Sequence, residues 1–207
     1  MSYQNFLKRE DVRSRYWFME RQFYNIILRA KINPTHRAAK WLDDQNKLAC
    51  IITQNVDGLF QQAGVDPARV IEIHGTEHKV KCLNCGTYSS RQDIEAMFKA
   101  GIYSPYCGKC SGLLKPATIL MGEELDKSLF EQALSNILAS DLLIIMGTSL
   151  QVDPVASIPD IAWQKGIPIV IINSTSTPRD HLAKMIINCP TGIFFKKFLR
   201  QTKKQDN

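Results

Sequence analysis

The chain has 207 residues, of which 44% are hydrophobic, so it can hold one ordinary globular domain with an insert or two small domains. No apolar run approaches the roughly 18 residues of a bilayer-spanning helix, and the first residues have no hydrophobic signal core. We therefore expect a soluble intracellular protein, cytoplasmic or in an organelle, with no membrane partner. The net charge of +6 is modest, and we expect the basic C-terminal stretch to be a solvated helix end, although it would also suit an acidic partner.

Helical patterns open the chain. Residues 10–30 place apolar side chains over a wide helical face, and Asn33-Pro34 is a typical helix start, with Asn as cap and Pro as first helical residue. That second helix is expected to end near residues 43–44. A strand over 48–52, a short helix over 57–63 and a strand over 70–73 follow, and later segments predict a helix over 127–139 and strands over 141–146 and 167–172.

Unbroken apolar runs that alternate with helices indicate strands covered on both faces, which is the pattern of a parallel α/β sheet. Each run ends on small or hydrogen-bonding residues, and the carboxyl ends of parallel strands meet at one edge of a sheet. That edge would suit a ligand rich in hydroxyls and phosphates, such as a nucleotide. The alternative is that each cluster is an ordinary turn or cap. The residues concerned are Thr53, Gln54, Asn55, Gly147, Thr148, Ser149 and Asn173, with Asp57 and His74 close to the first two strands.

Two CxxC turns predict a metal site. Cys82 and Cys85 form one pair and Cys107 and Cys110 the other, and four thiolates arranged in this way suit tetrahedral Zn²⁺. Two disulfides or a redox dithiol are the alternatives, which an intracellular location and a matched pair of turns disfavour. Four cysteine ligands leave no open position, so the zinc is expected to hold structure. Binding worth on the order of 10–16 kcal/mol would fold a segment with almost no apolar core of its own.

Taken together, these motifs resemble the sirtuins, the NAD-dependent protein deacylases. The resemblance covers nearly the whole chain from about Arg13, and its parts stand in the family's order: TQNVDG, His74-Gly75, the four cysteines, PATILMGE, GTSLQVDP and IIN ending at Asn173. It implies a Rossmann-like parallel sheet formed by residues 1–76 and 115–207, including the helical part 10–30, with a zinc-binding module over residues 77–114.

The resemblance also implies roles for these residues. His74 would be the general base, for which the ordinary imidazole pKa of about 6.5 is suitable. His74, Asn55 and Asp57 would form the catalytic group, with Gln54, Asn55 and Asp57 also holding the nicotinamide ribose and carboxamide. The remaining cofactor contacts would come from Gly147, Thr148, Ser149, Asn173 and Cys189.

The implied substrate is an acyl-lysine protein. Backbone at Gly122-Glu123 and at Gln151-Val152 would take the peptide as an added strand, which gives affinity with little sequence selectivity. The acyl oxygen would attack the ribose carbon as nicotinamide leaves, so that the products are the deacylated protein and O-acyl-ADP-ribose. The bound groups implied are therefore NAD and one structural zinc.

The chain departs from the family pattern at its start. The family's first strand and its Gly-rich phosphate loop have no counterpart here, since the first glycine is Gly58. The sheet is therefore expected to be incomplete, and losing about five buried apolar residues would cost roughly 10 kcal/mol. We expect a truncated form of a catalytic sirtuin; the alternatives are a natural chain that is longer and a partner that supplies the strand. Phe60 and Met121 stand where the family usually has His and Phe.

The sequence leaves two other functions open. One is a catalytically impaired sirtuin-like scaffold that binds proteins through its zinc module. The other is a nucleic-acid-binding zinc ribbon, for which Lys79, Lys81, Tyr88, Arg91 and Lys109 offer only a sparse set of basic and aromatic side chains.

Overall fold

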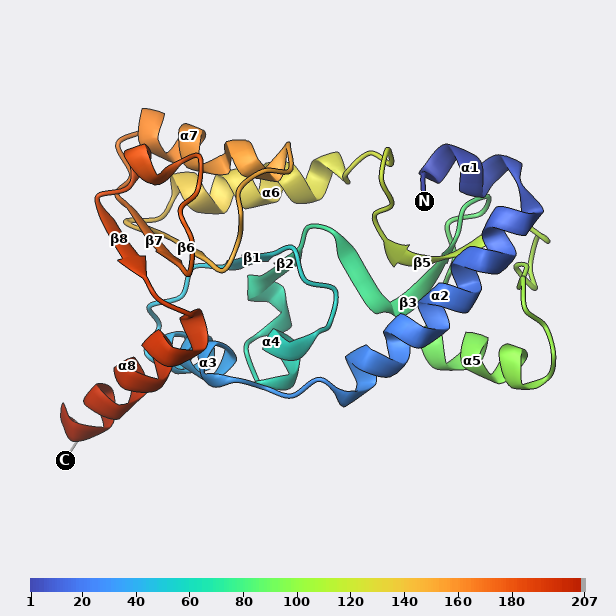
Figure 1. Ribbon diagram of the computed structural model, residues 1–207, viewed down its shortest axis with the longest axis horizontal. Helices are drawn as coiled ribbons and strands as arrows, with labels where there is room; N and C mark the ends of the chain where they lie inside the picture. Colours follow the sequence, from blue (N-terminus) through green and yellow to red (C-terminus); the bar gives the residue numbers. More distant parts are fainter. Residues whose placement is uncertain (206–207) are drawn as a thin grey trace. The chain divides into compact units, whose positions relative to one another are not determined.

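The computed structural model describes residues 1–205, and their contacts divide the chain into two compact units (Figure 1). The first unit contains Met1–Lys31, Ile52–Gln62 and Val70–Lys127. The second contains Ile32–Ile51, Ala63–Arg69 and the chain from Ser128 onward. The expected zinc module, residues 77–114, lies inside the first unit together with the N-terminal helices.

The first unit combines helices with short strands. Its helices are α1 (Tyr3–Lys8), α2 (Glu10–Arg29), α4 (Leu59–Gln62) and α5 (Arg91–Lys99). Strands β1 (Ile51–Thr53) and β2 (Val70–Glu72) form a two-stranded sheet, whereas β3 (Gly75–Cys82), β4 (Tyr88–Ser90) and β5 (Leu114–Thr118) form an antiparallel sheet in the order β4-β3-β5. The strand predicted over residues 48–52 corresponds to β1, which is shorter and begins later in the chain. Helix α1 and strand β5 were not predicted.

Helix α2 matches the predicted range, but its burial differs from the wide apolar face that was expected. Trp17, Tyr24 and Ile27 are buried, whereas Phe18 and Ile26 are 66% and 65% exposed. The buried residues recur at helical spacing along one side, because only that side packs on the rest of the unit.

The second unit is built on a parallel sheet. Strands β6 (Leu143–Met146), β7 (Ile169–Asn173) and β8 (Met185–Asn188) pair in this order, with Met146 opposite Ile172 and Asn173 opposite Asn188. Figure 1 shows α6 (Lys127–Leu138) and α7 (Ile158–Gln164) on one face of this sheet, and α3 (Pro34–Asp44) and α8 (Thr191–Gln205) on the other. The parallel prediction is confirmed for β6 and β7, and β8 adds a strand that the sequence analysis did not identify.

The face of the parallel sheet toward α3 and α8 is covered by apolar packing. The outer strands β6 and β8 are less buried than continuous apolar runs predict, since Ile144, Met185 and Ile186 are exposed. Ala38 from α3, Ile172 from β7 and Phe195 from α8 form a buried cluster, and the ring of Trp41 lies 5.3 Å from that of Phe198. Asn33 caps α3 as predicted, with a reciprocal hydrogen bond from its own N–H to His36 Nδ1 at 3.1 Å.

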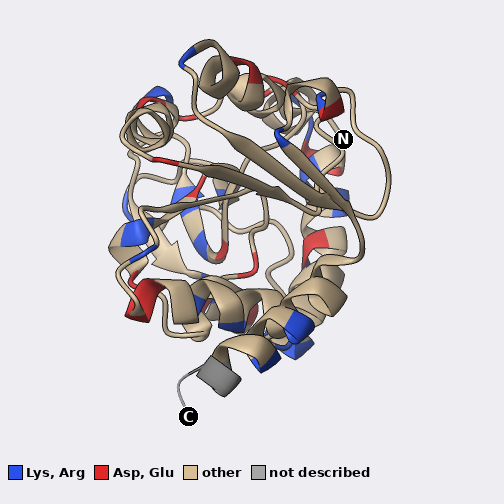
Figure 2. Cartoon of the chain, turned by 90° about the vertical axis from the view of Figure 1, so that its left-hand side faces the viewer, with Lys and Arg blue, Asp and Glu red and all other residues tan. Residues whose placement is uncertain are grey.

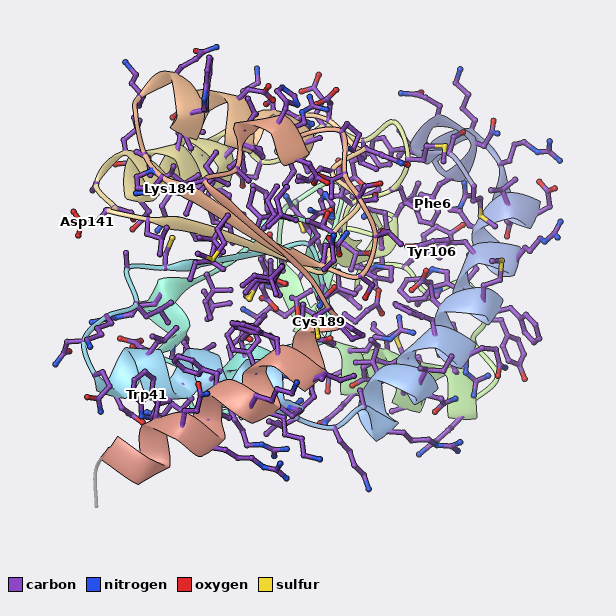
Figure 3. All side chains as sticks on the ribbon, turned by 60° about the vertical axis from the view of Figure 1, so that its left-hand side comes forward. Phe6, Trp41, Tyr106, Asp141, Lys184 and Cys189 are labelled. Atoms are coloured by element: carbon purple, nitrogen blue, oxygen red, sulfur yellow. The ribbon has the colours of Figure 1, made fainter. Side chains whose placement is uncertain are left out.

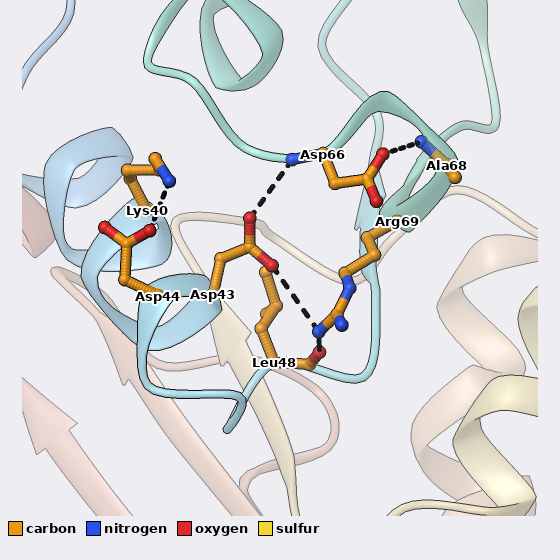
Figure 4. Close-up of polar contacts among 7 residues, drawn as sticks. All are labelled: Lys40, Asp43, Asp44, Leu48, Asp66, Ala68 and Arg69. Carbon is orange, nitrogen blue, oxygen red and sulfur yellow. Dashed lines mark hydrogen bonds and ion pairs between the residues drawn. The ribbon is translucent and has the colours of Figure 1, made fainter.

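A polar network ties the end of α3 to the short 3₁₀ turn Pro67–Arg69 (Figure 4). The Asp43 carboxylate accepts the N–H of Asp66 at 3.1 Å and lies 3.4 Å from the Arg69 guanidinium, which also donates to Leu48 O. Asp44, the next residue of α3, forms an ion pair with Lys40, one turn earlier in the same helix.

The C-terminal helix presents its charges to solvent. Lys196, Lys197 and Arg200 are exposed on α8, and Figure 2 colours the Lys and Arg positions along this helix. Lys203 and Lys204 lie outside the residues whose side chains are described. Among residues 1–205, no helix is both long enough and apolar enough to cross a bilayer.

Candidate functional site

The four predicted metal ligands come together in the first unit. The Sγ atoms of Cys82, Cys85, Cys107 and Cys110 all lie within 4.8 Å of one another. Two of the separations, Cys82–Cys110 and Cys85–Cys107, are 3.6 and 3.8 Å. A tetrahedron with Zn–S bonds of about 2.3 Å has edges of about 3.8 Å, so the donor set fits zinc in both chemistry and size.

The turns around the cluster keep the sulfur atoms close. Cys85 N–H donates to Cys82 Sγ at 3.5 Å, and the Cys85 thiol lies 3.4 Å from Thr87 Oγ1. Gly112 has no room for a side chain, because a Cβ there would lie 2.9 Å from Cys82 Sγ.

The metal-binding segment has more apolar core than the sequence indicated. Trp17 of α2 packs with Ile94 and Phe98 of α5 against Cys82 and Cys107, and every one of these side chains is buried. The expectation that the segment has almost no core of its own was wrong, because its own Val80, Ile94, Phe98 and Leu114 are buried together, and Trp17 from a helix more than sixty residues upstream adds to them. The Trp17 and Phe98 rings meet edge to face, 5.5 Å apart.

The end of β2 in this unit carries His74 beside the end of β1. Ile73 N–H donates to Thr53 O at 3.0 Å, so the two strand ends are aligned. The half-buried His74 ring hydrogen-bonds to the backbone of Gln54, and burial lowers the pKa of His74 below its usual 6.5. A lowered pKa favours the neutral imidazole, which can accept a proton. The predicted neighbours Gln54 and His74 do lie together.

The loop after β1 is held by contacts that the sequence did not reveal. Asn55 is exposed and its N–H donates to Thr53 Oγ1 at 3.1 Å, while Asp57 Oδ1 accepts the N–H of Leu59 at 2.9 Å and so caps α4. His78 Nε2 lies 2.9 Å from Asp57 O, and a Cβ on Gly58 would meet that ring at 2.9 Å. His78 was missed because it is twenty-one residues away from Asp57 and belongs to no motif.

The second candidate group lies at the carboxyl ends of the parallel strands of the second unit. Gly147 N–H donates to Ile172 O and Cys189 N–H to Asn173 O, each at 3.1 Å. Figure 3 shows Cys189 at one end of these strands and Asp141 and Lys184 at the other. Gly147 and Asn173 therefore share one edge, as predicted, and Cys189 lies there as well. Thr53, Gln54 and Asn55 were expected on the same edge, but they lie at the end of strand β1 of the separate β1-β2 sheet, in the first unit.

The polar groups of this edge suit ribose and phosphate. Asn173 Nδ2 donates to Thr175 O at 2.9 Å, and Thr148 Oγ1 accepts the N–H of Leu150 at 3.3 Å. Ser149 is exposed, as are Gln151 and Val152 of the predicted peptide segment. Leu150 is buried with a φ of +51°, which turns the chain sharply at this point.

The other predicted peptide segment belongs to the first unit. Gly122 is exposed, but the Glu123 side chain is only 16% exposed and turns toward Lys115 at 3.1 Å. The main-chain N–H of Glu123 donates to Leu120 O at 2.9 Å. Of the two departures from the family pattern, Phe60 is buried on α4, whereas Met121 is 77% exposed.

A buried ionisable cluster of the first unit was not anticipated. Glu77 on β3 is 1% exposed, and burial together with Glu20 raises its pKa to about 8. Arg91, with no exposed surface, lies with its guanidinium carbon 5.1 Å from the Trp17 ring and 4.9 Å from the Tyr24 ring. Such residues look like surface charges in a sequence, since their partners lie on other elements.

The chain resembles known proteins over most of its length. The pattern that defines the Sir2 family matches residues 1–154. An NAD-dependent protein deacetylase 2 of Streptomyces coelicolor is 36% identical over 200 residues, which are 97% of this chain and 82% of that protein. An NAD-dependent protein deacetylase of Thermodesulfovibrio yellowstonii is 35% identical over 96% of this chain and 77% of its own length.

Solved structures of Sir2 proteins also match the fold of this chain. A Sir2 bound to an acetylated peptide superposes with a TM-score of 0.89 and 27% identity, covering 98% of this chain and 82% of that one. A Sir2 with a p53 peptide and NAD⁺ gives a TM-score of 0.88 with the same identity and coverage.

Proposed function

The chain belongs to the Sir2 family, and from that membership we propose that it is an NAD-dependent protein-lysine deacylase whose reaction is carried by His74, Asn55 and Asp57. The observation that carries the proposal is the half-buried His74 at the end of β2, which hydrogen-bonds to the backbone of Gln54 and whose pKa is lowered by burial. A general base must be unprotonated at working pH and held in place, and His74 meets both conditions.

Each proposed role follows from a group's chemistry. His74 would take the proton from a ribose hydroxyl, and the amides of Gln54 and Asn55 would orient the nicotinamide end of the cofactor. The Asp57 carboxylate already caps α4, so its contribution would include holding this loop in shape. Bound NAD supplies the ADP-ribosyl acceptor for the acyl group and nicotinamide as the leaving group.

The remainder of the cofactor would be held by the strand ends of the second unit. Gly147, Thr148 and Ser149 offer backbone and hydroxyl groups for phosphate and ribose. Asn173 would accept from a ribose hydroxyl through its amide oxygen, and Cys189 would lie alongside. These are small polar groups next to parallel strand ends, which is the donor set that a dinucleotide needs.

The substrate would be an acyl-lysine segment of another protein. Main-chain groups at Gly122-Glu123 and at Gln151-Val152 would pair with the peptide as an additional strand. We also propose that the zinc module spans residues 77–114 and that the protein works inside a cell, where its four clustered thiols stay reduced and available to zinc.

The test is release of nicotinamide from NAD in the presence of an acetyl-lysine peptide. The wild type should release nicotinamide only with the acylated peptide, and the acid limb of its pH profile should fall below 6.5 because burial lowers the pKa of His74. His74→Ala should lose about 10²–10⁴-fold in rate. His181→Ala, which alters an exposed histidine of the second unit, is the matched control and should keep the wild-type rate.

Equal background rates for the wild type and His74→Ala would reject the enzyme and leave the alternative, a zinc-binding scaffold of sirtuin type. A His74→Ala variant as fast as the wild type, with both well above background, would instead reject His74 as the base.

A further inference from the structure

A lysine is buried beside the turn that the proposed function assigns to the peptide. Lys115, on β5, is only 2% exposed. Its Nζ donates to Pro116 O at 3.0 Å and to Thr118 O, and lies 3.1 Å from Glu123 Oε2. An ammonium group has three N–H donors, so a lysine here satisfies each of them, and its charge is neutralised by the carboxylate.

The Glu123 carboxylate carries this link into the turn. Glu123 Oε2 accepts the N–H of Leu120 at 2.9 Å, and Glu123 N–H donates to Leu120 O at 2.9 Å. Met121 O accepts the N–H of Tyr3 at 3.0 Å. Gly122, with a φ of +81°, lies within this closed turn. The conformation of residues 120–123 therefore depends on the Lys115–Glu123 pair and on the main chain of Tyr3.

The same strand end is joined to the proposed base. Ile119 N–H donates to His74 O at 3.0 Å. A Cβ on Gly75 would lie 1.8 Å from Ala117 O, so the backbone after His74 is pressed against β5. The segment 115–123 thus connects the residue after the proposed base to the turn that would meet the peptide.

Other charges face this lysine without reaching the turn. Glu20 on α2 and Glu77 on β3 attract the Lys115 ammonium at longer range. Arg91 is another buried cation of this unit, and it contacts Trp17 and Tyr24 of α2 and Glu95 of its own helix. Arg91 therefore offers a comparison: a cation of similar burial whose contacts are with helices.

We propose that Lys115 is a positioning residue that holds the main chain of Gly122-Glu123 in the conformation that accepts the acyl-lysine peptide. This inference rests on the proposed function, which assigns the peptide to that segment. A preorganised edge binds an added strand with less ordering cost than a mobile one. Loss of the link therefore weakens peptide binding while the cofactor groups at the other strand ends are unchanged.

The test compares three variants of the full chain. Lys115→Met removes all three donor contacts, whereas Glu123→Gln keeps an acceptor for Leu120 N–H and removes the charge that faces Lys115. Arg91→Met is the matched control that removes a buried cation elsewhere. For each folded variant, the measurements are amide hydrogen exchange of residues 119–123, the dissociation constant of an acetyl-lysine peptide, and KM for peptide and for NAD.

In the two loop variants, Lys115→Met and Glu123→Gln, the proposal expects faster amide exchange at Leu120 and Glu123. It also expects the peptide dissociation constant and KM for peptide to rise about tenfold. KM for NAD should stay within about twofold of the wild-type value in both variants. In Arg91→Met, the hydrogen exchange of residues 119–123, the dissociation constant of the peptide and KM for peptide should also stay within about twofold of wild type. If Lys115→Met does not fold, Glu123→Gln gives the answer by itself.

Unchanged exchange at Leu120 and Glu123 in the folded loop variants would overturn the proposal, as would a peptide effect of equal size in Arg91→Met. Hydrogen exchange does not require turnover, so these outcomes are distinct from failure of the proposed function. That failure would appear as a wild type that neither binds acyl-lysine peptide nor releases nicotinamide.

Discussion

Gly75 should be one of the least replaceable residues of the first unit. Its φ is +79°, and a Cβ there would lie 1.8 Å from Ala117 O and 2.8 Å from Ala117 C. Both atoms belong to the β5 backbone, which cannot rotate out of the way as a flexible side chain can. In Gly75→Ala, β5 must move by more than about 1 Å to reach an ordinary contact distance.

The cost can be divided into two parts with a matched control. Gly101 has a similar φ of +87° and nothing within 4 Å of the position that a Cβ would take, so Gly101→Ala measures backbone strain alone, about 1–2 kcal/mol. Gly75→Ala adds displacement of β5 and weakening of the Ile119–His74 hydrogen bond, each worth about 1 kcal/mol or more. We expect a total of about 3–4 kcal/mol for Gly75→Ala.

Urea denaturation of the two variants measures this difference directly. Because His74 precedes Gly75, nicotinamide release should also fall by about 10²-fold in Gly75→Ala and remain near the wild-type rate in Gly101→Ala. Equal destabilisation by the two substitutions would show that β5 does not constrain this position, and the packing argument would be refuted.

Three further predictions concern the metal, a buried carboxyl and the second unit. Cys82→Ser should lose about one equivalent of zinc by elemental analysis and unfold more readily, whereas Cys50→Ser, outside the cluster, should retain the metal; a metal-free, well-folded wild type would contradict the site. Glu77→Gln should flatten the dependence of stability on pH. The raised pKa of Glu77 means that the folded protein keeps a proton which the unfolded chain releases above about 4.5, so wild-type stability should fall as pH rises toward 8, and an equal fall in the variant would exclude Glu77 as its source. Asp43→Ala should cost about 1 kcal/mol in urea denaturation, because it removes the acceptor of Asp66 N–H and the ion pair with Arg69, and Asp44→Ala no more than about 0.5 kcal/mol; equal costs would argue against the network.

Local sequence signals predicted those elements whose causes are local. The Asn33-Pro34 cap, the range of α2, and the strand ends at Gly147 and Asn173 were all predicted correctly, because each depends on residues within a few positions. Strand β5 was missed because it pairs with β3 across a bulge, and its own sequence, LKPAT, has neither alternation nor an apolar run.

The burial of α2 is a second feature that local sequence signals could not predict in full. Helical spacing identified the helix, but it could not tell which of its apolar residues would be covered. Trp17 is buried by α5 and the cysteine turns, whereas Phe18, its neighbour in the sequence, points away from them and is exposed. Periodicity predicts that a helix has an apolar side, and only packing shows how wide the covered side is.

By itself, the sequence determined the four metal ligands, the parallel strands and the polar residues at their ends, since ligand spacing and apolar runs are properties of short stretches of chain. Tertiary structure alone decided that Lys115 reaches Glu123 and two carbonyls, that Glu77 meets Glu20 and that His78 supports the Asp57 loop. The free energy of a buried charge depends on partners that folding brings from other elements. The residues next to it in the sequence therefore do not predict it.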